Sequence, residues 1–250
     1  MRLSRPGHWF RSYGLLLTWS LLRLRSMLVL FTVLQLVLSV SIVLGFAFLM
    51  PEVDQQSASY LATGAPTIGV IVVTMVIAPQ IIKDDKLNGF FDYQRTLPVP
   101  RLATLAADAT IWIAVSIPGI IAGLIAAGLR FDLDYRLSPM IAVALPLVAI
   151  ACIALGYAIV YGLPPGLVSV VSQVLVFFVL LFSPITFPAE RLPDWLAAVH
   201  APLPLTYTAQ AVRESLMVPA GGISWQPYAM LLLWGAIGLA VASWVMARRR

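Results

Sequence analysis

Residues that could do chemistry with a soluble partner are concentrated between Lys83 and Arg101, in the stretch KDDKLNGFFDYQRTLPVPR. Of the polar stretches between long apolar runs, this is the one sizeable stretch that we expect to face the cytosol, and it contains the only lysines of the chain, Lys83 and Lys86. It contains two phenylalanines, a tyrosine and two arginines, and aromatic residues and arginine are enriched at protein interfaces. We therefore expect a soluble partner to contact this segment.

Nucleotide hydrolysis needs residues that this chain lacks. A phosphate-binding P-loop requires GxxxxGK followed by Ser or Thr, so that the lysine reaches the phosphates. Neither Lys83 nor Lys86 follows a glycine. We expect no ATP hydrolysis by this route and no catalytic residues, so ATP-driven work would require another subunit.

Metal and haem chemistry is also unsupported. The chain has one cysteine, Cys152, and two histidines, His8 and His200. The chain is expected to cross a membrane, with His8 and His200 on opposite sides of it. Ligands of the usual types therefore do not converge. We expect no metal, no resident cofactor and no intrachain disulfide, and we interpret Cys152 as a small packing residue.

The elements that position the polar segment are membrane-spanning helices. The chain is 60% hydrophobic and 11% charged, with a mean hydropathy of +0.93. About 20 apolar residues are needed to cross a bilayer, and one long apolar run is divided by the breaker at 162–166. We predict an all-α membrane protein, a single domain over residues 1–250 with six transmembrane helices at about 27–50, 60–82, 102–129, 137–161, 166–187 and 227–247.

Basic residues predict the orientation. Of the 16 lysines and arginines, all but Arg130, Arg136, Arg191 and Arg213 lie on the side that holds both termini and the 83–101 loop. Cytosolic loops are enriched in Lys and Arg. Both termini are therefore predicted to be cytosolic, which requires an even number of spans.

Two segments outside the spans have helical character. Residues 5–25 mix aromatic rings with arginines, which favours an interfacial helix on an anionic leaflet; the alternative is a basic flank that only sets topology. Residues 183–226 are predicted to be extracytosolic and carry two short helices, 194–200 and 206–218. We interpret them as a re-entrant hairpin or surface cap, with a disordered loop as the alternative.

One charge falls inside a span. Asp108 lies about two turns from the cytosolic end of the third span. An intramembrane acid is a functional candidate, but we favour pairing with a basic loop residue. In the same span, Gly119 and Gly123 form a GxxxG step that indicates helix packing.

With these features the chain resembles the membrane subunit of an ABC-2 type transporter, the six-span permease class that includes daunorubicin-resistance exporters. Gly89 and the Leu97-Pro98-Val99-Pro100-Arg101 run match the family's loop after the second span. Before the last span, the matching positions are Leu192, Pro193, Trp195, Pro204, Leu205, Thr206, Tyr207 and Arg213.

The resemblance implies that two permease chains pair and that each of two cytosolic ATPase subunits, which bind ATP and Mg, receives a coupling helix from residues 83–101. In that helix, Phe90, Phe91 and Tyr93 would be anchors, and Lys86, Asp92 and Arg95 would fix the register. Gly89, Leu97 and Pro98 complete the candidate coupling set.

The resemblance also implies that the first, second and fifth spans line the transport pathway. Polar residues that would do so are Thr32, Gln35, Ser39, Thr74, Ser169, Ser172 and Gln173. The alternative is that these side chains join packed helices by hydrogen bonds.

The expected function is that of a permease subunit of an ABC exporter for an amphipathic or hydrophobic small molecule, a drug or a lipid. Permeases for polysaccharide or haem-biogenesis export are the nearest alternatives, and an ATP-independent carrier or a membrane enzyme anchor is a more distant one. The expected location is the plasma membrane, as in a bacterial inner membrane. The expected partners are the ATPase, a second permease chain and membrane lipid, with no nucleic acid.

Overall fold

The chain forms a bundle of long helices, confirming the all-α membrane fold. The computed structural model describes residues 6–49, 54–89, 99–219 and 221–248. Six helices in this part are long and apolar enough to cross a membrane. The elements are α1 (Pro6–Leu49), α2 (Gln55–Ile71), η1 (Val72–Ile77), α3 (Ala78–Leu87), α5 (Arg101–Phe131), α6 (Ile141–Gly162), α7 (Pro165–Phe182), η2 (Ala189–Arg191), α8 (Asp194–His200), α9 (Pro204–Leu216) and α10 (Gln226–Arg248).

Three spans differ at their ends from the sequence prediction. The second begins at Gln55 rather than residue 60, because the Asp54 carboxylate accepts a hydrogen bond from Ser57 N at 3.2 Å and caps the helix. Hydrogen bonds from Ser57 also lower the pKa of Asp54. The fourth begins at Ile141 rather than residue 137, and the fifth ends at Phe182 rather than residue 187.

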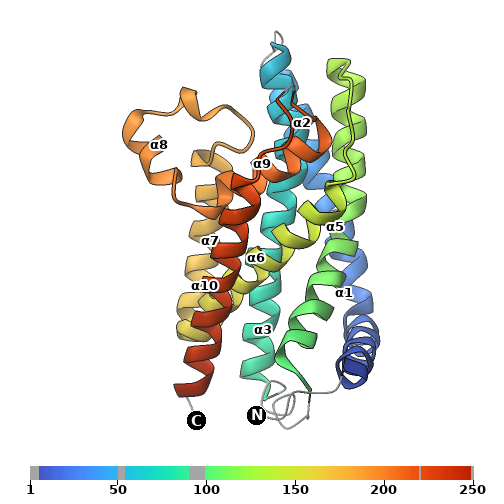
Figure 1. The fold of residues 1–250 in the computed structure, drawn as a ribbon, viewed down its shortest axis with the longest axis vertical. Helices are drawn as coiled ribbons and strands as arrows, with labels where there is room; N and C mark the ends of the chain where they lie inside the picture. The colour runs from blue at the N-terminus through green and yellow to red at the C-terminus, as the bar shows by residue number, and fades with distance from the viewer. Residues whose placement is uncertain (1–5, 50–53, 90–98, 220, 249–250) are drawn as a thin grey trace.

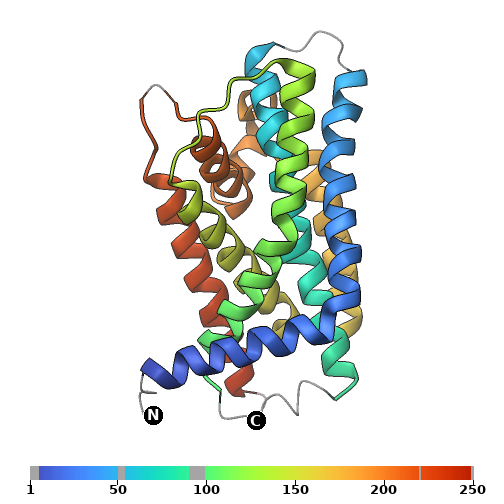
Figure 2. The ribbon, with the colours of Figure 1, turned by 90° about the vertical axis from the view of Figure 1, so that its right-hand side faces the viewer.

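The predicted interfacial segment and the first span are one continuous helix, α1. Figure 2 shows its N-terminal part crossing the end of the bundle before the helix turns along it. That part packs Leu16 against Ala103 and Ala107 of α5, and Tyr13 and Thr110 share a 2.9 Å hydrogen bond. The start of the chain is therefore fixed to α5, while its placement at a membrane surface stays a prediction.

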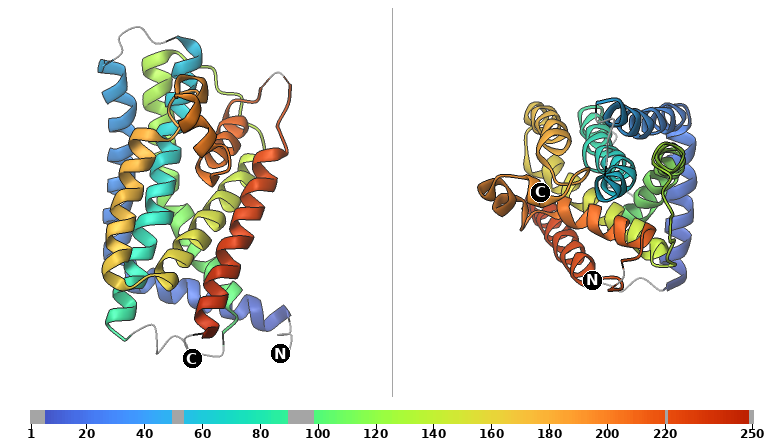
Figure 3. Two further views of the ribbon diagram at one scale, coloured as in Figure 1. Left: turned by 90° about the vertical axis from the view of Figure 1, so that its left-hand side faces the viewer. Right: turned by 90° about the horizontal axis from the view of Figure 1, so that it is seen from above.

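The second span, formed by α2, η1 and α3, is the centre of the bundle. Of its most apolar stretch 89% is buried within the chain, against 17% for α1, α7 and α10. Figure 3 shows the span between α1 on one side and α7 on the other. A helix so enclosed has its position set by its neighbours within the same chain.

Glycines allow the helices to approach closely. Any side chain at Gly69 of α2 or Gly119 of α5 would collide with Gln35 of α1, and Gly123 lies against Pro66 and Ser39. The predicted packing role of Gly119 and Gly123 is confirmed. Gly238 of α10 meets the backbone of α6 at Ala154 and Leu155. Small residues at such contacts are how helices associate in a membrane.

The short helices gather at the end of the bundle away from both termini (Figure 1). The loop after α5 joins them, because Ser138 N donates to Ser215 O at 2.9 Å. Tyr135 of this loop donates its hydroxyl to Leu124 O at 2.7 Å, and burial raises its pKa to about 12. The predicted helix at 194–200 is confirmed as α8, and α9 begins and ends two residues before the predicted 206–218.

The α6–α10 contact yields a paired test. In Gly238→Ala the new methyl group would stand 2.7 Å from the carbonyl carbon of Ala154, which is backbone and has no rotamer to change. We expect a loss of about 1–3 kcal/mol, seen as a lower melting temperature in detergent. Gly235→Ala is the control, since its methyl group would meet Ala151 Cα at an ordinary 3.5 Å. Equal melting temperatures for the two variants would contradict this packing.

Candidate functional site

The site is built on α3, the end of the second span that leads into residues 90–98. Lys83 Nζ donates to Ser169 Oγ of α7 at 3.0 Å. Asp85 accepts from Arg23 Nη1 of α1 with both carboxylate oxygens at 2.7 Å. Lys86 Nζ donates to Val160 O of α6 at 2.9 Å. One helical turn of α3 thus holds polar contacts to three other helices.

The chain leaves α3 at a glycine. Asn88 N donates to Asp84 O at 3.0 Å and closes the last turn, and Gly89 follows with φ of 73°. This left-handed conformation is adopted by glycine at little cost and commonly ends helices. Gly89, one of the predicted coupling residues, therefore ends α3 in the left-handed conformation.

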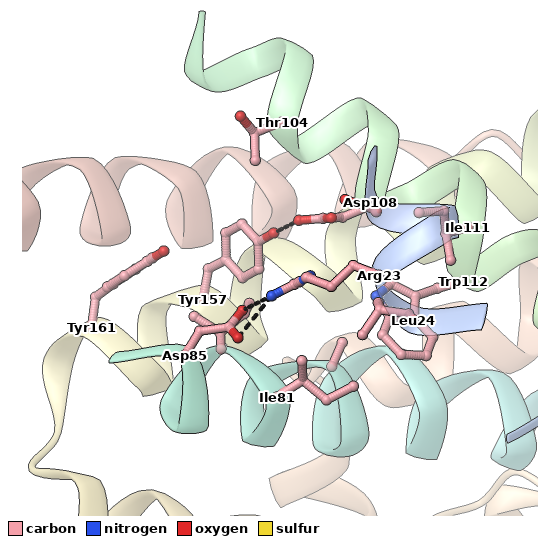
Figure 4. A pocket seen from close by; sticks show the side chains of 13 residues that line it. Arg23, Leu24, Ile81, Asp85, Thr104, Asp108, Ile111, Trp112, Tyr157 and Tyr161 are labelled. Carbon is pink, nitrogen blue, oxygen red and sulfur yellow. Dashed lines mark hydrogen bonds and ion pairs between the residues drawn. The ribbon is translucent and has the colours of Figure 1, made fainter. Parts of the chain in front are cut away.

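A small polar pocket lies beside α3 (Figure 4). Arg23, Asp85, Asp108 and Tyr157 contribute to its lining, and it encloses about 50 Å³. The Tyr157 hydroxyl donates to the Asp108 carboxylate. The pocket has room for small polar groups but is far below the roughly 300 Å³ or more of sites for drug-sized ligands. We interpret the pocket as a polar contact between helices rather than a cargo site. We call this contact, formed by Arg23, Asp85, Asp108 and Tyr157, the joint.

The predicted partner of Asp108 needs correction. We expected a basic loop residue, but the hydrogen bond comes from Tyr157 of α6, with Arg23 of α1 in the same pocket. The partner differs because Asp108 lies deep in the bundle. It faces the interior beside α6, where a tyrosine hydroxyl reaches it and the bundle encloses it. The joint is completed by Lys86, whose Nζ lies 4.8 Å from the centre of the Tyr161 ring.

Above the joint, the second span is not a regular α-helix. Residues Val72–Ile77 form a π-helix, in which the Ala78 N–H reaches back to Val73 O. Pro79 follows within α3 and has no N–H to donate. Gly156 of α6 accommodates the proline ring, since a side chain there would meet Pro79 Cγ at 2.5 Å. π turns are rare and frequently occur at functional sites, and the sequence analysis did not predict this one.

Most predicted coupling residues cannot be placed. Phe90, Phe91, Asp92, Tyr93, Arg95, Leu97 and Pro98 lie outside the described residues. Lys86 lies inside them and, as described above, its ammonium group contacts α6. Its charge therefore supports the joint within the chain.

The predicted pathway residues lie in different surroundings: some are buried in helix interfaces, and one is exposed. Gln35 and Ser39 are buried against the glycines of α2 and α5, and the Thr74 hydroxyl donates to Val70 O within its own span. Ser169 accepts from Lys83, and Ser172 is buried. Thr32 donates to Leu28 O, whereas Gln173 of α7 is exposed. The structure does not bring these side chains together in one place.

The re-entrant motif forms a folded turn between α8 and α9. Pro193 precedes α8, Pro204 begins α9, and Leu205 is buried while Trp195 is exposed. Thr206 Oγ1 donates to His200 O at 3.3 Å and the Tyr207 hydroxyl to Ala201 O at 2.8 Å. Arg213 points instead to α2, where Nε donates to Thr63 Oγ1.

Sequence reasoning did not assign Arg23, Tyr157 or Tyr161 to the site. Arg23 is 62 residues from Asp85, and both tyrosines sit in an apolar run where a tyrosine is unremarkable. A weak signal existed for Arg23, because it is a charge next to the start of a long apolar segment.

Six long apolar helices, with polar contacts from α3 to α1, α6 and α7 near one end of the bundle, define a multi-pass membrane protein. The family model for the ABC-2 family transporter protein matches residues 32–244. The chain therefore belongs to this family and is a membrane component of an ABC transporter. Its partner is, as a class, an ABC ATPase. A comparison with curated proteins finds no match.

The Arg23–Asp85 pair allows a charge-swap test. Its side chains are 28% and 20% exposed, so we expect Arg23→Asp or Asp85→Arg to cost about 1 kcal/mol or more, and the double swap to recover part of the loss. Melting temperatures of the four proteins measure the coupling. The Arg191–Asp54 pair, 48% and 58% exposed, is the control and should show less. Additive effects of Arg23→Asp and Asp85→Arg would contradict the pairing.

Proposed function

We propose that this chain is the permease subunit of an ATP-driven exporter, powered by separate ATPase subunits that contact residues 83–101. The observation that carries the proposal is the position of α3. It comes directly before the loop that family resemblance assigns to coupling, and it holds α1, α6 and α7 through Asp85, Lys86 and Lys83. A force applied to the loop would reach three spans at once.

The π turn supplies a pivot for this transmission. A π turn accommodates an extra residue in the helix, so α3 can change its rotation relative to α2 without either helix unfolding. α2 is held by its glycine contacts, for example where Gly64 meets the backbone of Ile185. In this proposal α3 moves, α2 stays fixed, and η1 lies between them.

The remaining features of the proposal extend the family assignment. Two permease chains pair, both termini and the 83–101 loop face the cytosol, and the complex resides in a plasma membrane such as a bacterial inner membrane. The cargo is an amphipathic or hydrophobic small molecule. Its support is the family resemblance and the mild polarity of the helix interfaces, where Gln35 and Ser172 carry hydrogen-bonding groups without charge.

Changing Phe90 and Phe91 to Asp tests the coupling loop. An aromatic anchor removed from a partner's groove costs roughly 2 kcal/mol or more, and a buried carboxylate adds a desolvation penalty. We expect the reconstituted complex to lose at least tenfold in ATP-driven transport while the permease still folds. Trp225→Asp is the control, because Trp225 is 78% exposed and directly precedes α10, whose first turn lies at the end of the bundle away from both termini (Figure 1). Undiminished transport by the Phe90 and Phe91 variant would refute the assignment.

Replacing Pro79 tests the pivot. Pro79→Ala restores an N–H after the π turn, so the helix can close to the α form. We expect the complex to assemble but the coupling of ATP hydrolysis to transport to fall severalfold. Pro66→Ala, in the same span but within regular helix α2, is the matched control. If both variants transported equally, η1 would have no role in coupling.

A further inference from the structure

Arg213 is a half-buried cation at the end of the bundle that carries α8 and α9. Its Nε donates to Thr63 Oγ1 at 3.1 Å, and its Nη2 donates to Ile185 O at 2.8 Å. The guanidinium carbon lies 3.6 Å from the centre of the Tyr60 ring. Three elements, α2, α9 and the turn at Ile185, thus fix the orientation of this side chain.

None of these three partners is an anion. Among the described residues, no carboxylate forms an ion pair with Arg213. The adjacent Glu214 is directed elsewhere, because its carboxylate accepts from Ser224 N at 2.6 Å and from Gln210 Nε2 at 2.8 Å. A buried charge is normally paired, since desolvation of an isolated ion is costly. The charge of the adjacent Glu214 acts on Arg213, but Arg213 forms no ion pair with it or with any other described carboxylate.

Arg191, which also contacts α2, provides the contrast. It lies one to two turns closer to the start of that helix, where it bonds Ser57 Oγ at 2.7 Å and pairs with Asp54 at 3.3 Å. Arg191 is the more exposed of the two arginines and has a carboxylate. Arg213, the less exposed arginine, has no carboxylate partner. If the two arginines served structure alone, the less exposed one would be expected to have the partner.

Donors remain at Arg213 for a further group. A guanidinium carries five N–H groups in a planar fork, and Nη1 makes no hydrogen bond within the described part of the chain. The Tyr60 hydroxyl, on the ring against which the guanidinium stacks, also makes none there. The Thr63 hydroxyl proton is already committed to Ser59 O at 2.8 Å. The available donors therefore belong to Arg213 and Tyr60.

We propose that Arg213 and Tyr60 form a binding site for an oxyanion of the phosphate type. The fork of the guanidinium matches the spacing of phosphate oxygens, and the contacts to Thr63 and Ile185 hold it in a fixed orientation before the ligand arrives. Two sources share this chemistry, a phospholipid headgroup in the membrane leaflet nearest α9 and a free phosphate group in solution. Burial lowers the pKa of Arg213 to about 10, so the site keeps its charge at neutral pH.

The experiment uses the full chain in micelles of a maltoside detergent, which carries no phosphate, in a phosphate-free buffer. One arm adds increasing fractions of phosphatidylglycerol to the micelles, and the other adds inorganic phosphate to the buffer. The melting temperature measures binding through the stabilisation that a ligand of the folded state confers. Wild type, R213Q, R213K and Y60F are compared, with R191Q as the matched control.

We expect the anion to raise the melting temperature of wild type and R191Q, with at least a tenfold higher concentration needed for R213Q. R213K keeps the charge without the fork and Y60F keeps the ring without the hydroxyl, so both should be intermediate. If R213Q does not fold, the comparison of wild type with R213K and Y60F tests the proposal. Stabilisation by phosphatidylglycerol alone identifies a headgroup, and stabilisation by phosphate alone identifies a soluble anion. The proposal is overturned if neither anion stabilises wild type, or if R213Q and R191Q respond alike.

Discussion

Enclosure of the second span is the constraint on which the rest of the structure depends. Lipid chains are as apolar as leucine, so helices in a bilayer associate through close packing and hydrogen bonds rather than through the hydrophobic effect. Glycines meet this requirement on several sides of the span, at Gly64 toward Ile185, at Gly69 toward Gln35 and at Gly156 toward Pro79. Because α2 is held at Gly64 and Gly69, the movement of α3 proposed above would leave α2 in place.

Close packing between helices also encloses polar side chains that make no hydrogen bond. Gln35 is fully buried, and neither atom of its amide has a partner in the described part of the chain. An unsatisfied amide is costly, so the side chain is poorly suited to a purely structural interior. It nevertheless sits where Gly69 and Gly119 leave space for it, and this fit fixes the register of α1 against both neighbours. A shift of α1 by one residue would place Leu34 or Leu36 against those glycines.

Hydropathy predicted the spans because each membrane helix must satisfy its own backbone, which leaves a long apolar run as a strong local signal. The turn residues were equally informative: Pro193 and Pro202 bracket α8 and allowed its range to be predicted. The π turn left no such trace, since VVTMVI reads as ordinary apolar helix and Pro79 alone indicates only a kink. The Arg23–Asp85 pair joins segments 62 residues apart, so it depends on the packing of whole helices that no local pattern encodes.

The enclosure also limits where cargo can pass. A pathway between two chains that includes the second span would have to be reached past other helices of the same chain, since 89% of the apolar stretch of that span is covered within one chain. The outer faces of α1 and α7 are already open, with Val37 56% and Phe177 55% exposed. In this state α1 and α7 can line an interface, whereas α2 cannot. Access to α2 therefore requires that a helix covering it move, and α1 is one such helix that also contacts α3, through Arg23.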